Sequence, residues 1–133
     1  MPGAILAVGL AVAVVFAFMA APASGHVARW DSRVRITDYV DNASFLGRVR
    51  SERRACRDRR LVTVWKRNPG AMHGPVDTAR TNRAGIWAVH APGLLELPES
   101  DVYFATVKRR VLRRSAEHRH VCKAAQSPDY RIF

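Results

Sequence analysis

Basic side chains are the most abundant chemically active groups in this sequence, and they gather in two stretches. The chain has 133 residues, with 22 Lys and Arg against 11 Asp and Glu, which gives a formal net charge of +11. The first stretch occupies residues 50–60 and the second residues 108–123. Guanidinium groups bind phosphate and carboxylate in bidentate fashion, and dense basic clusters bind anionic polymers with release of counterions. The pattern therefore indicates an anion-binding surface.

We expect that surface to be formed by residues of both stretches. They are Arg53, Arg54, Arg57, Arg59, Arg60, Lys108, Arg109, Arg110, Arg113 and Arg114. An anionic extracellular polymer or an acidic protein is the expected partner, rather than a specific nucleic acid, because no recognition helix or nucleic-acid motif is visible. The alternative is that the basic surface reflects only the amino-acid composition of the protein. Of the 22 basic residues 19 are Arg, as in proteins from GC-rich genomes, and such a surface would be basic without any ligand.

The chain has two cysteines, Cys56 and Cys122, one in each basic stretch. If the chain is exported, two cysteines most simply form one disulfide. No C-x-x-C motif or neighbouring ligand pair favours the alternative of a reactive or metal-binding thiol. A bond across the 65 intervening residues would contribute roughly 4 kcal/mol of stability by the loop-entropy estimate. It would also bring the two basic stretches together at one end of the domain.

The remaining ionisable residues form no recognisable catalytic set. The carboxylates are scattered, without the pair that glycoside hydrolysis uses, and there is no G-x-S-x-G elbow or phosphate-binding loop. His118 and His120 would share a strand face and could bind a metal, but no third ligand is close in sequence. We therefore predict no catalytic residues, no metal and no cofactor, and a protein that is not an enzyme.

One metal-dependent alternative involves the start of the exported chain. If a leader were removed after Gly25, His26 would become the N-terminal residue, whose amine and ring can chelate copper together with a second His. The copper-dependent polysaccharide monooxygenases use this arrangement and are similar in being exported β-sandwiches, although they are much larger. A mature N-terminus at Ser24 would remove this possibility.

The N-terminal region reads as an export leader. Residues 1–28 carry no charged side chain, and residues 4–21 form an unbroken run of apolar or small residues. We predict a signal peptide over residues 1–25, because Ala21 and Ala23 form the small-residue pattern that a signal peptidase accepts. The alternative is an uncleaved N-terminal helix that anchors the protein in a membrane, since the run approaches the ~20 residues that cross a bilayer. The predicted location is extracellular, with no membrane insertion after cleavage.

The elements that must position the basic residues read as short strands. Alternation and β-branched or aromatic content predict strands at residues 32–39, 45–49, 61–65, 78–81, 86–89, 102–107 and about 122–132. Residues 41–43 read as a turn, residues 50–60 as an exposed loop and residues 68–76 as a second loop. The strands at 78–81 and 86–89 are expected to form a hairpin through a turn at 82–85. A helical turn is conceivable only within residues 107–119.

These elements predict an all-β protein. The expected architecture is a single antiparallel Greek-key β-sandwich of about seven strands after a hydrophobic leader helix. Beyond the leader over residues 1–25, we expect an N-terminal segment over 26–43 with a possible first strand and a β-sandwich domain over 44–133. The chain after the leader is about the size of one domain.

Four short motifs suggest a family. They are F-x-G-x-V-x-S from Phe45, V-x-V from Val62, T-x-x-x-G-x-W from Thr81 and V-Y-x-A-x-V from Val102. In this order they resemble the carboxypeptidase-regulatory-like and transthyretin-like (prealbumin-like) β-sandwich domains, over residues 44–132. Small secreted bacterial versions of these domains also carry a cysteine after the first of these strands and another before the last. The glycine that usually precedes the tyrosine strand is absent, with residues 99–101 reading Glu-Ser-Asp instead.

Several residues of these motifs are expected to support the fold. They are Gly47, Gly85, Trp65, Trp87 and Phe104. Gly85 would supply the positive φ that a tight turn requires. Trp87 would project into the core, with Trp65 and either Phe104 or Tyr103 as its neighbours. Tyr103 is the aromatic residue that could face outward instead.

The sequence therefore predicts a secreted, non-catalytic binding or structural module. Its basic loop end would contact an anionic cell-surface polymer. The alternative is a structural assembly domain that packs on a larger extracellular partner through a sheet edge or an apolar face, with no polyanion role.

Overall fold

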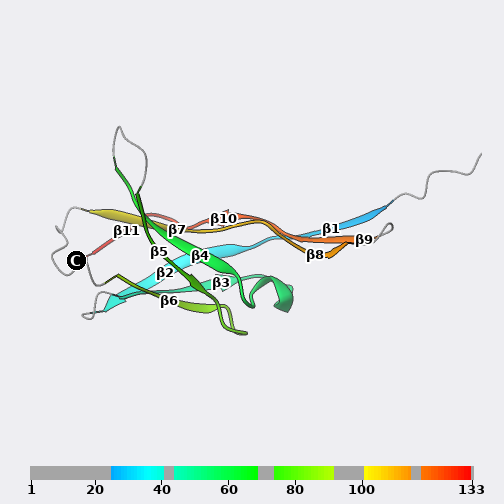
Figure 1. Cartoon of the computed structure of the whole chain (residues 1–133), viewed down its shortest axis with the longest axis horizontal. Coiled ribbons are helices and arrows are strands. Elements are labelled where there is room, and N and C mark those ends of the chain that lie inside the picture. Colours follow the sequence, from blue (N-terminus) through cyan, green and yellow to red (C-terminus); the bar gives the residue numbers. More distant parts are fainter. Residues whose placement is uncertain (1–24, 41–43, 69–73, 92–100, 115–117, 133) are drawn as a thin grey trace, which may run out of the picture.

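The computed structural model (Figure 1) describes residues 25–40, 44–68, 74–91, 101–114 and 118–132, with the backbone alone for 113 and 114. Within these residues the protein is all-β, with eleven strands and one short 3-10 helix. The strand count exceeds the predicted seven, because the predicted last strand is divided in two and three further strands form a sheet of their own that was not predicted. The predicted leader, except Gly25, and the predicted turn at 41–43 lie outside the described residues.

The first sheet contains three strands in the order β2-β3-β6. They are β2 (Arg33–Val40), β3 (Ser44–Arg50) and β6 (Ile86–His90), and all neighbours are antiparallel. The strands predicted at 32–39, 45–49 and 86–89 are therefore confirmed. Because β2 pairs with β3, the segment before residue 44 belongs to the same sheet as the strands of the predicted domain.

The second sheet has the order β10-β7-β4-β5. It contains β4 (Leu61–Lys66), β5 (Gly74–Arg80), β7 (Val102–Val107) and β10 (Ala125–Gln126), while β11 (Tyr130–Arg131) also pairs with β7. β10 and β11 both pair with β7 and are separated by a short irregular segment. The predicted last strand is thus present in pieces.

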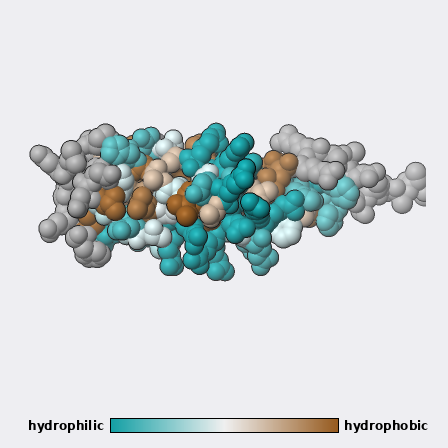
Figure 2. All heavy atoms as spheres, turned by 90° about the horizontal axis from the view of Figure 1, so that it is seen from below, coloured by the Kyte–Doolittle hydropathy of each residue, from teal (hydrophilic) through white to brown (hydrophobic). Residues whose placement is uncertain are grey.

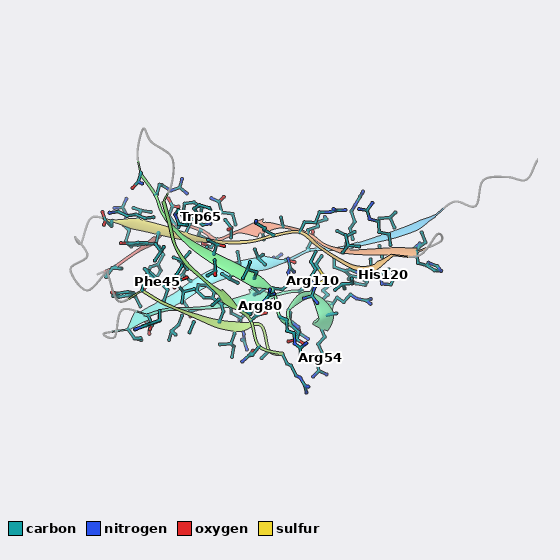
Figure 3. All side chains as sticks on the ribbon, viewed as in Figure 1. Phe45, Arg54, Trp65, Arg80, Arg110 and His120 are labelled. Atoms are coloured by element: carbon teal, nitrogen blue, oxygen red, sulfur yellow. A yellow bond between two sulfur atoms is a disulfide. The ribbon has the colours of Figure 1, made fainter. Side chains whose placement is uncertain are left out.

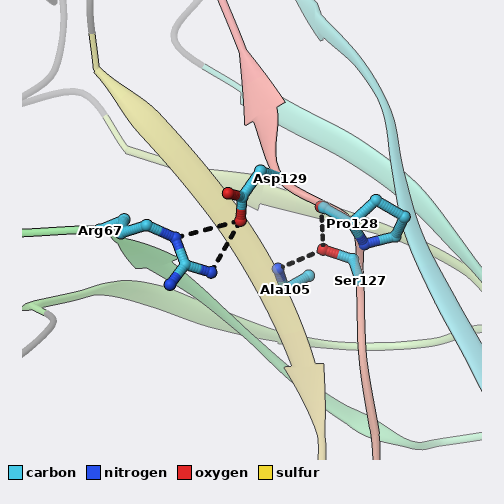
Figure 4. A network of polar contacts seen from close by, with 5 residues as sticks. All are labelled: Arg67, Ala105, Ser127, Pro128 and Asp129. Atoms are coloured by element: carbon cyan, nitrogen blue, oxygen red, sulfur yellow. Dashed lines mark hydrogen bonds and ion pairs between the residues drawn. The ribbon is translucent and has the colours of Figure 1, made fainter.

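Ser127 fixes that irregular segment against β7. Its hydroxyl accepts a hydrogen bond from the Ala105 amide at 2.8 Å and donates to the Pro128 carbonyl at 2.9 Å (Figure 4). Beside it, Arg67 forms an ion pair with Asp129 at 2.7 Å. The Ser127 amide also donates to the Ala105 carbonyl at 2.8 Å, so a backbone bond and a hydroxyl bond together hold this segment against β7.

The third sheet extends away from the other two as a narrow arm (Figure 1). Its order is β1-β9-β8, formed by β1 (His26–Trp30), β9 (His118–Cys122) and β8 (Arg110–Arg114). β1 runs parallel to β9, so the prediction of a purely antiparallel fold is wrong. A short hairpin turn would force neighbouring strands to be antiparallel. β1 and β9 are far apart in the sequence, so they can pair in parallel. Strand β8 also occupies part of the segment where a helical turn was considered.

The main core lies between the first two sheets. Its fully buried members come from β2, β3 and β6 on one side and from β4 and β7 on the other, and they are Val34, Ile36, Phe45, Val49, Val62, Val64, Trp87, Val89, Tyr103, Ala105 and Val107. They occupy alternate positions along each strand, which is the pattern of a sheet buried on one face. The two sheets therefore pack face to face through these side chains.

The predicted hairpin is the clearest error in the expected topology. β5 pairs with β4 and β6 pairs with β3, so the turn between them carries the chain from one sheet to the other. β5 also begins at Gly74, inside the predicted loop. Pro75 is tolerated there because β5 is an edge strand, where a missing amide donor leaves no ladder bond unmade.

The two motif glycines have distinct structural roles. Gly85 has a φ of 82°, as predicted for the turn, and its amide donates to the Asn82 carbonyl at 2.9 Å. Gly47 lies opposite Trp87 in the ladder, and a Cβ at Gly47 would collide with the indole ring and with the Arg35 carbonyl. The absence of a side chain at Gly47 lets Trp87, which is 2% exposed, lie flat over the strand.

The predicted aromatic cluster is divided between two faces. Trp87 and Tyr103 belong to the core, and Tyr103 is fully buried rather than facing outward. Trp65 and Phe104 stack with ring centroids 6.4 Å apart on the opposite face of the second sheet, and Arg67 lies 4.6 Å above the Phe104 ring. Their expected contact with Trp87 is wrong, because both occupy the outward positions of β4 and β7.

The contact between Gly47 and Trp87 predicts a large asymmetry between two glycine substitutions. Gly47→Ala should lower the free energy of unfolding by about 3 kcal/mol, because overpacking forces the indole or the strand to move. Gly74→Ala is the control, since its Cβ would meet only the Asn68 side chain at an ordinary 3.7 Å. Urea titration followed by tryptophan fluorescence compares them, and equal midpoints would contradict this packing.

Burial of Tyr103 predicts a loss of stability at alkaline pH. Desolvation, reinforced by nearby Asp101, raises the pKa of Tyr103 above its usual 10. Above pH 10 the unfolded state releases the phenol proton while the folded state retains it, so stability falls as the pH rises. The slope should approach about 1.4 kcal/mol per pH unit. Denaturant titrations from pH 9 to 11 should show a smaller slope in Tyr103→Phe than in wild type, and identical slopes would refute it.

Candidate anion-binding surface

A disulfide joins the two basic stretches, as predicted. Cys56, at the end of the 3-10 helix η1 (Arg54–Cys56), is bonded to Cys122 at the end of β9, with their Cα atoms 5.4 Å apart. Both cysteines are fully buried. The bond fixes the loop of residues 51–60 against the base of the arm. It is compatible with an extracellular location.

Arg60 lies inside this junction rather than on its surface. It is 1% exposed, and its guanidinium donates to the carbonyls of Cys56 at 2.7 Å, Lys108 at 2.8 Å and Lys123 at 3.1 Å. A fourth bond, of 3.0 Å, goes to the Ser32 hydroxyl. The expected role of Arg60 in external anion binding is therefore corrected. Its planar set of donors instead satisfies acceptors from four separate chain segments.

The charge of Arg60 is buried without a carboxylate among these four acceptors. Desolvation, assisted by repulsion from Arg110, lowers the pKa of Arg60 to about 10. Arg60 therefore remains a cation at neutral pH. Its charge lies directly beneath the surface residues that surround it, and it adds to their positive potential.

Arg60 forms part of the lining of a basic groove of about 390 Å³. The basic groove is lined by Arg59, Arg60, Leu61, Arg80, Lys108, Arg109 and Arg110. No carboxylate belongs to this lining in the part of the chain that the structure describes. Five of the predicted residues, from both basic stretches, are thus brought to one groove, together with Arg80 from the end of β5.

Backbone carbonyls orient two arginines of the basic groove. Arg80 donates to the Arg59 carbonyl at 3.2 Å, and Arg110 donates to the Asp58 carbonyl at 2.8 Å. Arg59 itself has a φ of 51°, in the left-handed region that non-glycine residues seldom adopt. Arg59, Lys108 and Arg109 are exposed. These three charged groups therefore reach solvent on a rigid base.

The remaining residues of the predicted cluster are not in the basic groove. Arg57 lines a second hollow, described next, while Arg53 lies with its guanidinium carbon 5.4 Å from the Trp30 ring centroid. Arg54 is exposed on η1 (Figure 3). The side chains of Arg113 and Arg114 lie outside the described part of the structure. The loop of residues 51–60 thus separates the predicted surface into two.

The second hollow, the Trp30 groove, has a volume of about 620 Å³. Its charged lining consists of Arg29, Arg33, Arg48, Arg50 and Arg57 with Asp31 and Glu52, and Trp30 and Ser51 also line it. Hydrophilic side chains cover the middle of the face shown in Figure 2. Because Arg33, Arg48 and Arg50 of the groove belong to β2 and β3, the basic surface extends from the loops onto the strands.

Sequence reasoning missed Arg33, Arg48 and Arg80 as surface residues of these grooves. A usable signal was present, because all three stand at outward positions of strands that were largely predicted. The prediction concentrated on charge density along the chain. Charge density along the chain does not show which charges of neighbouring strands lie opposite one another.

The histidines do not assemble a metal site among the described residues. The rings of His26 and His118, on the parallel strands β1 and β9, have centroids 5.9 Å apart and meet edge to face. His120 follows on the same side of β9. The copper alternative, which depends on the mature N-terminus, stays an untested hypothesis.

Comparison with protein-family models finds no match to this chain, and comparison with curated proteins also finds none. The family resemblance of the four motifs therefore stays a prediction. No helix among the described residues is long and apolar enough to cross a membrane.

The bonding of Arg60 predicts that it is a structural residue. Arg60→Met should lower the free energy of unfolding by about 3 kcal/mol or more, because several buried carbonyls lose their donors. Arg54→Met removes the same charge from an exposed position and should change stability by about 0.5 kcal/mol or less. Chemical denaturation of the oxidised proteins measures both, and similar midpoints would show that Arg60 does not hold the junction.

Proposed function

We propose that this protein is a secreted, non-catalytic β-sandwich module that binds an anionic extracellular polymer through its basic groove. The observation that carries the proposal is a groove lined by six basic residues and no described carboxylate. A Greek-key sandwich related to the carboxypeptidase-regulatory-like and transthyretin-like domains is part of the same proposal. It is supported by the core shared between two sheets and by the order of the four motifs.

The geometry suits a polymer better than a small ligand. Among the described residues that line the groove, all are basic except Leu61. The exposed cations belong to separate segments of the chain. Binding would then come from charge neutralisation along an extended chain, with release of counterions. Arg59, Lys108 and Arg109 would make the contacts, while Arg60, Arg80 and Arg110 hold the surface in shape.

Secretion is supported by the apolar leader and by the disulfide. Glutathione keeps thiols reduced inside most cells, so a buried structural disulfide favours an oxidising compartment. An anionic wall or surface polymer is abundant in that compartment. The proposal therefore joins the location and the charge of the protein in one role.

Heparin serves as a model polyanion for testing the groove. The variant Arg59→Gln/Lys108→Gln/Arg109→Gln should elute from immobilised heparin at much lower salt than wild type. The plot of log affinity against log salt should be shallower by about 2, because three neutralised contacts release fewer counterions.

The control carries the same change of net charge at exposed sites that do not line the basic groove, as Arg83→Gln/Arg119→Gln/Arg131→Gln. It should elute close to wild type. If both triple variants lose retention equally, only net charge matters, and the groove is not the binding site.

The alternative function, assembly with a larger partner, is favoured by the edge strand β1. It pairs only with β9 in the described structure, and Val27 on it is 48% exposed. An unpaired edge can add a strand from another chain. This function predicts that cell-surface retention is unchanged in both triple variants.

A further inference from the structure

The Trp30 groove lies where the arm meets the first sheet, on the other side of the disulfide loop from the basic groove. The end of β1, the start of β2 and the end of β3 contribute to it, together with Ser51 and Arg57 of the loop. It therefore collects side chains from segments far apart in the sequence. Nothing in the polymer-binding role of the basic groove requires this second concentration of arginines.

Like charges face each other directly along this groove. Arg33 of β2 is the cross-strand partner of Arg50 of β3, and Arg48 stands two residues earlier on the same outward side of β3. None of the three forms an ion pair with a described carboxylate. Like charges directly opposite one another destabilise a sheet. An anion held between Arg33 and Arg50 would turn this repulsion into attraction.

Hydrogen-bond donors without partners gather at the same place. Among the described residues, Trp30 Nε1, Ser51 Oγ, Arg53 Nε and Arg57 Nε are buried and have no hydrogen-bond partner. Trp30, Ser51 and Arg57 line the groove, and Arg53 lies over the Trp30 ring. Buried donors are almost always satisfied in folded proteins. Acceptor oxygens of a ligand bound in the groove would satisfy the donors that line it.

The two acidic residues of the lining have different surroundings. Asp31 is engaged by Lys123, whose ammonium lies 2.8 Å from its carboxylate. Glu52 is exposed and forms no ion pair with the described residues. The five arginines thus exceed the two carboxylates by three charges. A ligand must carry more than one negative charge to use this excess.

We propose that the Trp30 groove binds a phosphate group, held between Arg33 and Arg50 and hydrogen-bonded by neutral donors such as Trp30 Nε1 and Ser51 Oγ. A phosphate has several acceptor oxygens in a tetrahedral arrangement and a charge of about −1.5 to −2 at neutral pH. It therefore matches a mixture of guanidinium, indole and hydroxyl donors better than a planar, singly charged carboxylate does. The group can belong to free phosphate or to a phosphate monoester.

Binding of this group should stabilise the folded protein. The ligand would join β2, β3 and the disulfide loop, which separate on unfolding, so its affinity is for the folded state. Thermal unfolding of the oxidised protein, followed by circular dichroism, is the measurement. The probes are inorganic phosphate and glycerol phosphate, each exchanged for chloride at constant ionic strength.

The midpoint should rise with phosphate concentration and saturate. A rise with glycerol phosphate as well shows that the groove accepts a monoester, whereas a rise with inorganic phosphate alone assigns the free ion. If neither probe shifts the midpoint beyond the chloride control, the proposal is overturned.

Variants locate the effect in the groove. Arg33→Gln/Arg50→Gln should weaken phosphate binding about tenfold or more, because two charge-assisted contacts are lost. This variant removes a like-charge pair and should fold at least as stably as wild type without phosphate. Arg35→Gln/Arg131→Gln is the control, since it removes the same number of charges and relieves the repulsion between Arg35 and its cross-strand partner Arg48. Neither residue lines the groove, so this variant should retain binding.

Two further substitutions test the chemistry of recognition. Trp30→Phe keeps an aromatic ring and removes the indole N–H, so it should weaken phosphate binding. Glu52→Gln removes a repulsive charge and should tighten binding about threefold or more. The variant with three changes in the basic groove should bind phosphate as wild type does, which separates this site from the polymer site. Undiminished binding in Arg33→Gln/Arg50→Gln would overturn the assignment.

Discussion

The convergence of four chain segments on the Arg60 guanidinium is the interaction on which the rest of the structure depends. The loop before β4, the turn between β1 and β2, the link from β7 to β8 and the link from β9 to β10 all supply an acceptor to it. Burial of a charge is costly unless hydrogen bonds replace its hydration. Here the acceptors are oxygens that would themselves lack donors, so the cation and the carbonyls satisfy each other. The neighbouring disulfide holds the same loop covalently, and together they set the position of the arm relative to the sheets.

This junction explains why the charged surface takes the form it does. The loop of residues 51–60 is fixed between the arm and the sheets, with Arg57 turned toward one hollow and Arg59 toward the other. A single cluster expected from charge density thus becomes two surfaces of different chemistry. The basic groove presents exposed cations on a base without described carboxylates. The Trp30 groove combines facing arginines with buried neutral donors, a mixture that would suit a compact anion with several acceptor oxygens.

Much of the local structure could be predicted, because alternation of apolar residues fixes which face of a strand is buried. The strands around Phe45, Val62 and Val102, the positive φ of Gly85 and the disulfide follow from residue type and spacing. The pairing of strands does not. The segment around Asn82 reads as a hairpin, but its two flanking strands find better partners in opposite sheets. Arg60 likewise reads as one basic residue among many, and only the tertiary arrangement of backbone carbonyls makes it internal. Trp65 and Phe104 were misplaced for the same reason, since aromatic strand residues can pack on either face of a sheet.

The central feature of the structure is that Arg60 is an internal hydrogen-bond donor and not a surface cation. Nuclear magnetic resonance of the arginine guanidinium groups in the oxidised protein tests it most directly. The Arg60 Nη protons should give separate, slowly exchanging signals, because their bonds to the carbonyls of Cys56, Lys108 and Lys123 restrict rotation and exclude water. Arg54, exposed on the same loop, should show averaged and rapidly exchanging protons. If the Arg60 protons exchange as fast as those of Arg54, the junction is not built as described here.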